Sequence, residues 1–128
     1  MTFIALGILE KDGKVLVCRR NRSFFHDNLW EFPTTVVEHG ETVEDSLEKW
    51  VFEATGVLSA CEKAFPALNG PGCRIFPVKM NTLNEKKSLS YYDFCKLLKY
   101  KDLRWVNMTF PSVIFIKNEK KLGIFHLG

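Results

Sequence analysis

The sequence predicts an α/β (α+β) domain in which a mixed β-sheet carries one or two packed helices. Two patterns lead to this fold class. Short β-branched and aromatic runs, separated by turn residues, occupy most of the chain. One segment after residue 42 instead repeats its apolar residues every three or four positions, as an amphipathic helix does. The length of 128 residues fits one domain, residues 1–128, which would bury roughly two-thirds of its unfolded surface.

The chain is expected to open with a β-hairpin. Residues 3–9 and 14–20 are apolar runs, and Lys11-Asp12-Gly13 between them is a tight-turn sequence. After an irregular polar stretch at 21–28, short strands are expected around a bend at 29–33 and 36–37. The turn Glu38-His39-Gly40 follows them.

The helix is expected to begin after Thr42 and to end at Gly56. Its apolar positions share one face at helical spacing, and they are Val43, Leu47, Trp50, Val51 and Ala54. Thr42 with Asp45 three residues later fits an N-terminal capping pattern, and Gly56 supplies the C-terminal stop.

Further strands are expected in the second half of the chain. Residues 58–65 and 74–80 lie on either side of the turn Gly70-Pro71-Gly72, and residues 89–97 follow a charged turn at 84–87. The tail at 111–121 has two interpretations. Its run 113–116 favours a strand, whereas Pro111 and the polar residues 117–121 allow a helix.

Composition and charge exclude several functions. The net charge of +3, from 18 basic and 15 acidic residues, is too small to predict nucleic-acid binding by electrostatics alone, but it is compatible with a small anionic ligand. The apolar residues 1–9 are too few to span a bilayer, so we expect no membrane partner. The four cysteines form no CxxC pair and none lies at a metal-ligand spacing from a histidine, so we expect reduced, mostly buried thiols in a cytoplasmic protein.

The run Leu29-Trp30-Glu31-Phe32-Pro33, the loop to Glu41-Thr42, the helix and Gly56-Val57 together resemble the Nudix family. The resemblance is to the MutT-like branch, which hydrolyses oxidised nucleotides such as 8-oxo-dGTP, and it extends nearly end to end. It implies the Nudix fold, a mixed β-sheet sandwiched between helices. It also implies pyrophosphohydrolysis of a nucleoside (d)NTP with Mg2+ or Mn2+, and it favours a helix for the tail.

The family's Nudix box, G-x5-E-x7-R-E-U-x-E-E-x-G-U, falls on residues 35–57. Glu41 matches its first glutamate, Glu53 the first of its paired glutamates, and Gly56-Val57 its end. Other positions depart from the pattern. Thr34-Thr35 replace two glycines, Lys49 replaces the arginine, and two of the three helix glutamates are replaced by Trp50 and Ala54.

These replacements weaken the predicted metal site. Magnesium needs several oxygen ligands, and a helix brings carboxylates together only at spacings of three and four residues. Positions 50, 53 and 54 have this spacing, yet only Glu53 is acidic. The resemblance therefore implies Glu53 and Glu41 as metal ligands, with Glu53, Glu41 and Lys49 as catalytic candidates, but metal-dependent hydrolysis is expected to be weak or lost.

Two alternatives remain open. One is a purely structural role for the predicted catalytic residues, and the other is a metal site restored by other acids. Glu41, Lys49 and Glu53 could form a local charge cluster that contributes about 0.2–0.5 kcal/mol per pair without any chemistry. Other acids, namely Glu44, Glu48, Glu85 or Asp93, could restore the metal site, although Glu44 and Glu48 also fit the solvated face of the helix.

The family resemblance also places a nucleotide-binding pocket. It implies Arg20, Phe32 and Arg74 as substrate contacts, and Thr109 at a position that commonly reads the base, with Asn107 as the substitute in another loop register. Two of them have a structural alternative. Arg20 could be a solvated strand end, and Phe32 could belong to the core.

Three functions follow. The first is a Nudix pyrophosphohydrolase. The second is a non-catalytic module that binds a nucleotide or another phosphate-bearing small molecule without metal, using Arg20, Lys49 and Arg74. The third is a protein-interaction module anchored by Trp50, whose helical spacing with Leu47 and Ala54 favours burial instead.

Overall fold

The computed structural model describes residues 1–20, 30–85 and 100–107, with only the backbone of residues 20, 84, 85 and 101. The first two strands, β1 (Thr2–Lys11) and β2 (Lys14–Arg20), form the predicted hairpin. Asp12 and Gly13 both have positive φ, 51° and 74°, as a two-residue turn between right-twisted strands requires. The hairpin prediction is confirmed.

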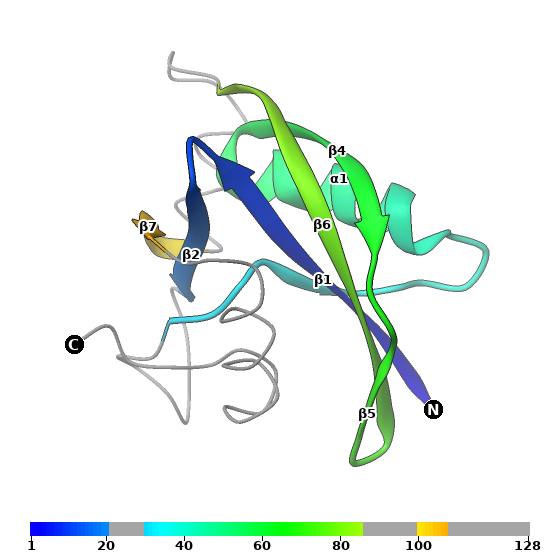
Figure 1. Cartoon of the computed structure of the whole chain (residues 1–128). Coiled ribbons are helices and arrows are strands. Elements are labelled where there is room, and N and C mark those ends of the chain that lie inside the picture. The colour runs from blue at the N-terminus through cyan, green and yellow to red at the C-terminus, as the bar shows by residue number, and fades with distance from the viewer. Residues whose placement is uncertain (21–29, 86–99, 108–128) are drawn as a thin grey trace.

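The remaining elements in chain order are β3 (Thr34–Val36), α1 (Val43–Thr55), β4 (Val57–Ala64), β5 (Leu68–Gly70), β6 (Cys73–Glu85) and β7 (Tyr100–Asn107). All seven strands belong to one sheet, in the order β4-β6-β1-β2-β7, with β3 paired to β1 and β5 paired to β6. β1 and β6 run parallel and the other pairs are antiparallel, so the sheet is mixed, as predicted (Figure 1).

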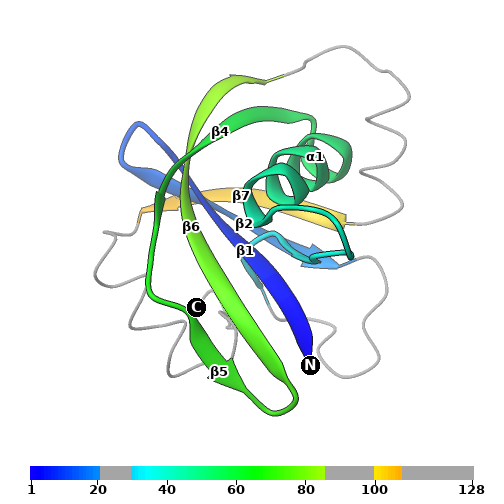
Figure 2. The ribbon, with the colours of Figure 1, turned by 90° about the vertical axis from the view of Figure 1, so that its right-hand side faces the viewer.

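The helix α1 lies against one face of this sheet (Figure 2). Side chains alternate between the two faces of a strand. Ala5 and Leu9 of β1 pack with Leu47 and Val51 of α1, whereas Leu6 and Ile8 form a second core cluster. Gly7 leaves room for the Met80 side chain of β6, because a Cβ there would lie 2.8 Å from Met80 Sδ.

Several boundaries differ from the sequence prediction. The turn expected at 84–87 is wrong for Asn84 and Glu85, which extend β6 by pairing with Leu58 and Val57 of β4. Around residues 29–33 the described part forms only an isolated bridge between Glu31 and Cys18. The strands β5 and β7 were not predicted, because their sequences are interrupted by glycine or charged residues. The predictions for 21–28, 89–97 and 111–121 lie outside the described residues.

The cysteines described agree only partly with expectation. Cys18, Cys61 and Cys73 are free thiols. Cys18 is buried, but Cys61 and Cys73 are only half-buried. In the described part of the chain, no helix has the length and apolar character needed to cross a bilayer.

Candidate functional site

The helix α1 is fixed at both ends by the residues that the sequence singled out. The Thr42 hydroxyl accepts a hydrogen bond from the Asp45 amide at 3.1 Å, and Gly56 adopts the left-handed conformation with φ 75°. The Gly56 amide donates to the Phe52 carbonyl at 2.9 Å. Both predicted caps are confirmed, so the register of every side chain on α1 is set.

Glu41 organises the loop that leads into α1. One carboxylate oxygen, Oε1, accepts hydrogen bonds from the Glu38 amide and from the Ser46 hydroxyl, each at 3.1 Å. The Glu41 amide in turn donates to the Glu38 carbonyl at 3.0 Å, and Gly40 has a φ of 88° that closes this turn. The positive end of the helix dipole also favours a carboxylate here. Glu41 is therefore held in place by local contacts.

A pocket of about 210 Å³ lies between β3 and the face of α1 that carries Glu53. It brings together Glu41, Lys49 and Glu53, the three residues predicted to be catalytic. Its complete lining is Thr35, Val36, Glu38, Glu41, Ser46, Lys49, Trp50 and Glu53. We call this site the β3–α1 pocket.

The predicted charge cluster is not formed as ion pairs. Lys49 is exposed, and within the described residues it makes no ion pair with Glu41 or Glu53. The four-residue spacing places Lys49 and Glu53 on the same side of α1, but the Glu41 oxygen is already bonded to Ser46 and Glu38. Lys49 therefore lines the pocket as an exposed, positively charged residue.

Trp50 forms an anchored wall of the pocket. Its indole Nε1 donates to the Tyr100 hydroxyl at 3.2 Å, and the two rings meet edge to face with centroids 6.3 Å apart. Tyr100 is 1% exposed and packs with Cys18 and Ala54, which are fully buried. The two replacements in the Nudix box thus differ, because Trp50 borders the pocket whereas Ala54 belongs to the core.

The described side chains do not fit a magnesium ion well. Among them, no three acidic, histidine or cysteine side chains lie close enough together to hold a metal ion. Glu41 already uses Oε1 for two hydrogen bonds, Lys49 brings a positive charge to the same pocket, and an indole stands at position 50. Such a donor set lacks the several converging oxygens that magnesium requires.

Two of the other predicted ligand contacts, Phe32 and Arg74, do not line the pocket. Phe32 is fully buried in the core cluster with Trp30, as its packing alternative predicted. Arg74 is exposed on β6, across β1 from β3, with its guanidinium 5.8 Å from the Phe76 ring. Arg20 ends β2, and its side chain is outside the described part, as is all of Thr109.

Asn107 lies at the wrong end of the sheet for contact with the pocket. It pairs with Lys14 next to the hairpin turn, and Lys14 pairs with Lys11. Thr35 of the pocket pairs with Ala5, six residues back along β1. At a rise of roughly 3.3 Å per residue, Asn107 is about 20 Å away along the strand direction.

Of the four acids proposed to restore a metal site, the structure describes the side chains of two, Glu44 and Glu48. Glu44 and Glu48 are absent from the pocket lining and lie toward β4, where the Cys61 thiol donates to the Glu44 carbonyl at 3.8 Å. Burial, followed by the charges of Glu48, Glu44 and Asp45, raises the pKa of Cys61 to about 12. Glu85 ends β6 with only its backbone described, and Asp93 lies outside the described residues.

Ser46 and Glu38 were missed by the sequence reasoning. Ser46 is buried at 4% exposure, and its hydroxyl holds Glu41. Helical spacing could have found it, because positions 46, 49, 50 and 53 share one face of α1. Glu38 gave no such signal, since it enters the pocket only through the Glu38–Glu41 turn.

Residues 1–107 match the family described as the NUDIX domain. The chain belongs to the Nudix family. The Nudix domain therefore covers every strand of the sheet and α1, and the β3–α1 pocket lies within it. Proteins of this family act on nucleotide-type substrates and generally use divalent metals.

Individual relatives agree with this assignment. An ADP-ribose pyrophosphatase of Methanocaldococcus jannaschii is 32% identical over 65 residues, which are 51% of this chain and 38% of that protein. The match therefore spans well under half of that relative. The structure of an ADP-ribose pyrophosphatase of Streptococcus suis superimposes with a TM-score of 0.63 at 17% sequence identity. The superposition covers 82% of this chain and 72% of the Streptococcus suis chain.

A MutT Nudix hydrolase of Burkholderia pseudomallei has a TM-score of 0.62 at 17% identity, covering 91% of this chain and 95% of its own. At such low identities these structures show the shared Nudix fold alone. The fold prediction is confirmed.

Proposed function

We propose that this Nudix domain binds a nucleotide or another phosphate-bearing small molecule at the β3–α1 pocket, and that metal-dependent pyrophosphohydrolysis there is weak or absent. One observation carries the proposal. The indole of Trp50, held by Tyr100, borders the pocket one helical turn from Glu53, at a position where a carboxylate would be needed beside it. The reaction that the resemblance implies for this pocket is a MutT-like cleavage of a nucleoside triphosphate.

Within the proposed site the residues have separate tasks. Glu41 keeps the loop closed through Glu38 and Ser46, and the exposed Lys49 ammonium supplies positive charge for a phosphate. Glu53 is the acid best placed to hold a metal or to position a water, because it lines the pocket from the helix. No step through a metal ion is assigned to the described residues.

The second candidate is a module that has lost hydrolysis altogether and binds its ligand without any metal, and Lys49 favours it. An ammonium that enters the pocket without pairing to Glu41 or Glu53 can neutralise part of a phosphate charge without metal. The interaction module anchored by Trp50 has less support, because the indole is half-buried and already bonded to Tyr100.

Calorimetric titration separates these candidates. Mg2+ and Mn2+ would be titrated into the wild type, Glu53→Gln and the control Glu44→Gln, which removes an acid from the same helix outside the pocket. A nonhydrolysable nucleoside triphosphate would be present, and a substrate panel of 8-oxo-dGTP, other (d)NTPs and ADP-ribose would follow. We expect nucleotide binding with little metal dependence, weakened by Lys49→Gln.

Two results would contradict the proposal. Tight metal binding that Glu53→Gln abolishes and Glu44→Gln preserves, together with rapid turnover of a panel member, would show an intact hydrolase. If no nucleotide binds, with or without metal, the proposed ligand is refuted and the interaction module is the remaining candidate.

A further inference from the structure

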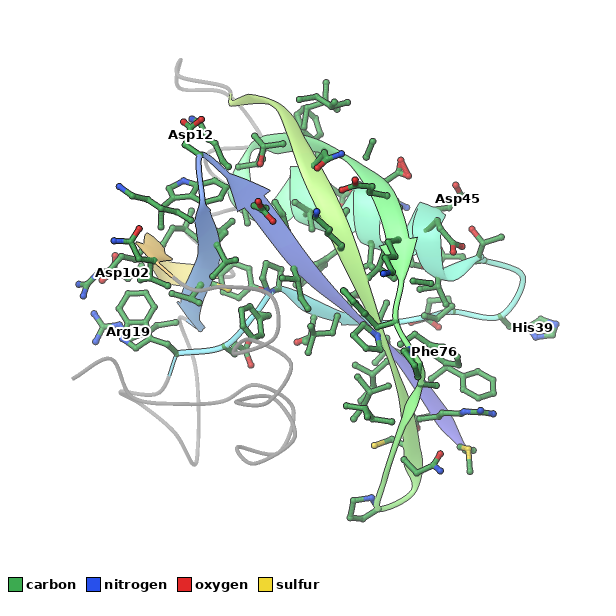
Figure 3. All side chains as sticks on the ribbon, in the orientation of Figure 1. Asp12, Arg19, His39, Asp45, Phe76 and Asp102 are labelled. Carbon is green, nitrogen blue, oxygen red and sulfur yellow. The ribbon has the colours of Figure 1, made fainter. Side chains whose placement is uncertain are left out.

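A second charged and aromatic cluster lies at the edge formed by β2 and β7. Arg19 of β2 pairs with Asp102 of β7, and Val17 pairs with Arg104, so the two arginines are diagonal neighbours on one face of the sheet. Val17 belongs to the core cluster on the face opposite α1. Figure 3 shows Arg19 and Asp102 together at this edge, across the molecule from His39, which marks the loop beside the β3–α1 pocket.

Both guanidinium groups lie against the same indole. The guanidinium carbon of Arg19 is 4.9 Å and that of Arg104 is 4.7 Å from the ring centre of Trp30, which is 4% exposed. Asp102 Oδ2 accepts a hydrogen bond from Arg19 Nη2 at 3.0 Å. Asp102 thus pairs with Arg19 and not with Arg104, so the described cluster has a surplus positive charge.

Some hydrogen-bond donors of this cluster have no acceptor among the residues that the structure describes. Arg19 Nε is buried and has no acceptor in the described part of the chain. Arg104 is exposed, and it forms no ion pair among the described residues. Stacking on the indole fixes both planar groups, so the exposed Arg104 guanidinium can offer its N–H donors to an incoming oxyanion beside the Arg19 charge.

Covering Trp30 does not by itself require two arginines. A single arginine covers an aromatic ring elsewhere in this chain, where Arg74 lies 5.8 Å from the Phe76 ring. The second arginine at Trp30 adds like-charge repulsion across neighbouring strands, which a bound anion would remove. A phosphate group offers three acceptor oxygens, so it can meet donors of both guanidinium groups, whereas a carboxylate offers only two.

We infer that the Arg19–Trp30–Arg104 cluster is a binding site for a phosphate group of a small molecule, separate from the β3–α1 pocket. The inference is independent of the proposed function, because the cluster lies on the opposite face of the sheet from α1 and shares no residue with the pocket. The site would recognise inorganic phosphate, pyrophosphate or the terminal phosphate of a nucleotide by the same contacts.

The test is titration of inorganic phosphate and pyrophosphate at constant ionic strength, followed by calorimetry and by the thermal unfolding temperature. Three variants are compared with the wild type: Arg104→Gln, Arg104→Lys and the matched control Arg74→Gln. We expect saturable binding that weakens at least tenfold in Arg104→Gln, weakens less in Arg104→Lys and is unchanged in Arg74→Gln. A nucleoside and its monophosphate distinguish recognition of the phosphate from recognition of the base.

Several outcomes would overturn the inference. One is the absence of saturable binding once ionic strength is held constant, and another is an equal loss in Arg74→Gln and Arg104→Gln. If Lys49→Gln abolishes phosphate binding while Arg104→Gln preserves it, the phosphate binds at the β3–α1 pocket instead, which supports the proposed function and refutes this site. Unfolding without ligand shows whether Arg104→Gln still folds, and Arg104→Lys carries the test if it does not.

Discussion

Restoring the two missing helix glutamates one at a time should give opposite results. Trp50 borders the β3–α1 pocket, so a glutamate there can place its carboxylate in the pocket beside Glu53. Ala54 is fully buried against Cys18 and Tyr100, so a glutamate there would place a charge in the core. We expect Trp50→Glu to fold and to bind Mn2+ and Mg2+ more tightly than the wild type, and Ala54→Glu to unfold.

The cost of each change follows from its contacts. Trp50→Glu removes a hydrogen bond to Tyr100, worth about 0.5–1.5 kcal/mol, and an edge-to-face ring pair of similar size. The free energy of unfolding should therefore fall by about 1–3 kcal/mol, or roughly 4–12 °C in Tm for a domain of this size. Ala54→Glu adds an unpaired buried charge and excess volume, which cost several kcal/mol out of a total near 5–15 kcal/mol.

Thermal unfolding and metal calorimetry on both variants test this reasoning, with Glu44→Gln as the control on the exposed side of α1. Equal Tm values for Trp50→Glu and Ala54→Glu would refute the placement of these positions. A folded Trp50→Glu variant with no gain in metal affinity would show that the missing carboxylate is not what limits metal binding in this pocket.

Three further predictions concern the elements that hold the site. Leu47→Ala removes a fully buried side chain between α1 and the sheet and should lower the free energy of unfolding by about 2–5 kcal/mol in urea titrations; a loss under 1 kcal/mol would contradict the packing. Thr42→Ala should cost about 1 kcal/mol in the same assay, because the Asp45 amide loses its acceptor, whereas Thr42→Ser should restore it. Cys61 should resist alkylation at pH 8, since a pKa of about 12 instead of 9.0 leaves roughly 1000-fold less thiolate. Mass spectrometry of the Cys61 peptide measures its rate in native protein and in urea, and rates within tenfold of each other would exclude the shift.

Much of the fold could be predicted from local sequence. The hairpin turn at Asp12-Gly13 and the caps Thr42 and Gly56 were confirmed because each depends on backbone conformation within a few residues. The strands β5 and β7 escaped prediction for the complementary reason. Their sequences favour strands only weakly. They form because β6 and β2 have backbone groups available for pairing with them.

The candidate site shows the same division. Helical spacing alone placed Lys49, Trp50 and Glu53 near one another, and the pocket confirms that they share a surface. Spacing gave no information on Asn107 and Arg74, whose distance from the pocket is fixed by strand register. In the sequence comparison with the Nudix box, Trp50 and Ala54 were equivalent losses of a carboxylate. In the structure, Trp50 borders the pocket and Ala54 lies in the core.

The sequence by itself determined the Nudix frame, the ends of α1 and the loss of two helix carboxylates, because turns, caps and periodic spacing act over a few residues. Only the tertiary structure decided that Tyr100 holds Trp50 at the pocket and that Arg19 and Arg104 meet over Trp30. Trp50 and Tyr100 are 50 positions apart in the sequence. Arg19 and Arg104 are brought together by the register of β2 against β7. Such contacts depend on how the core packs, and no local pattern encodes them.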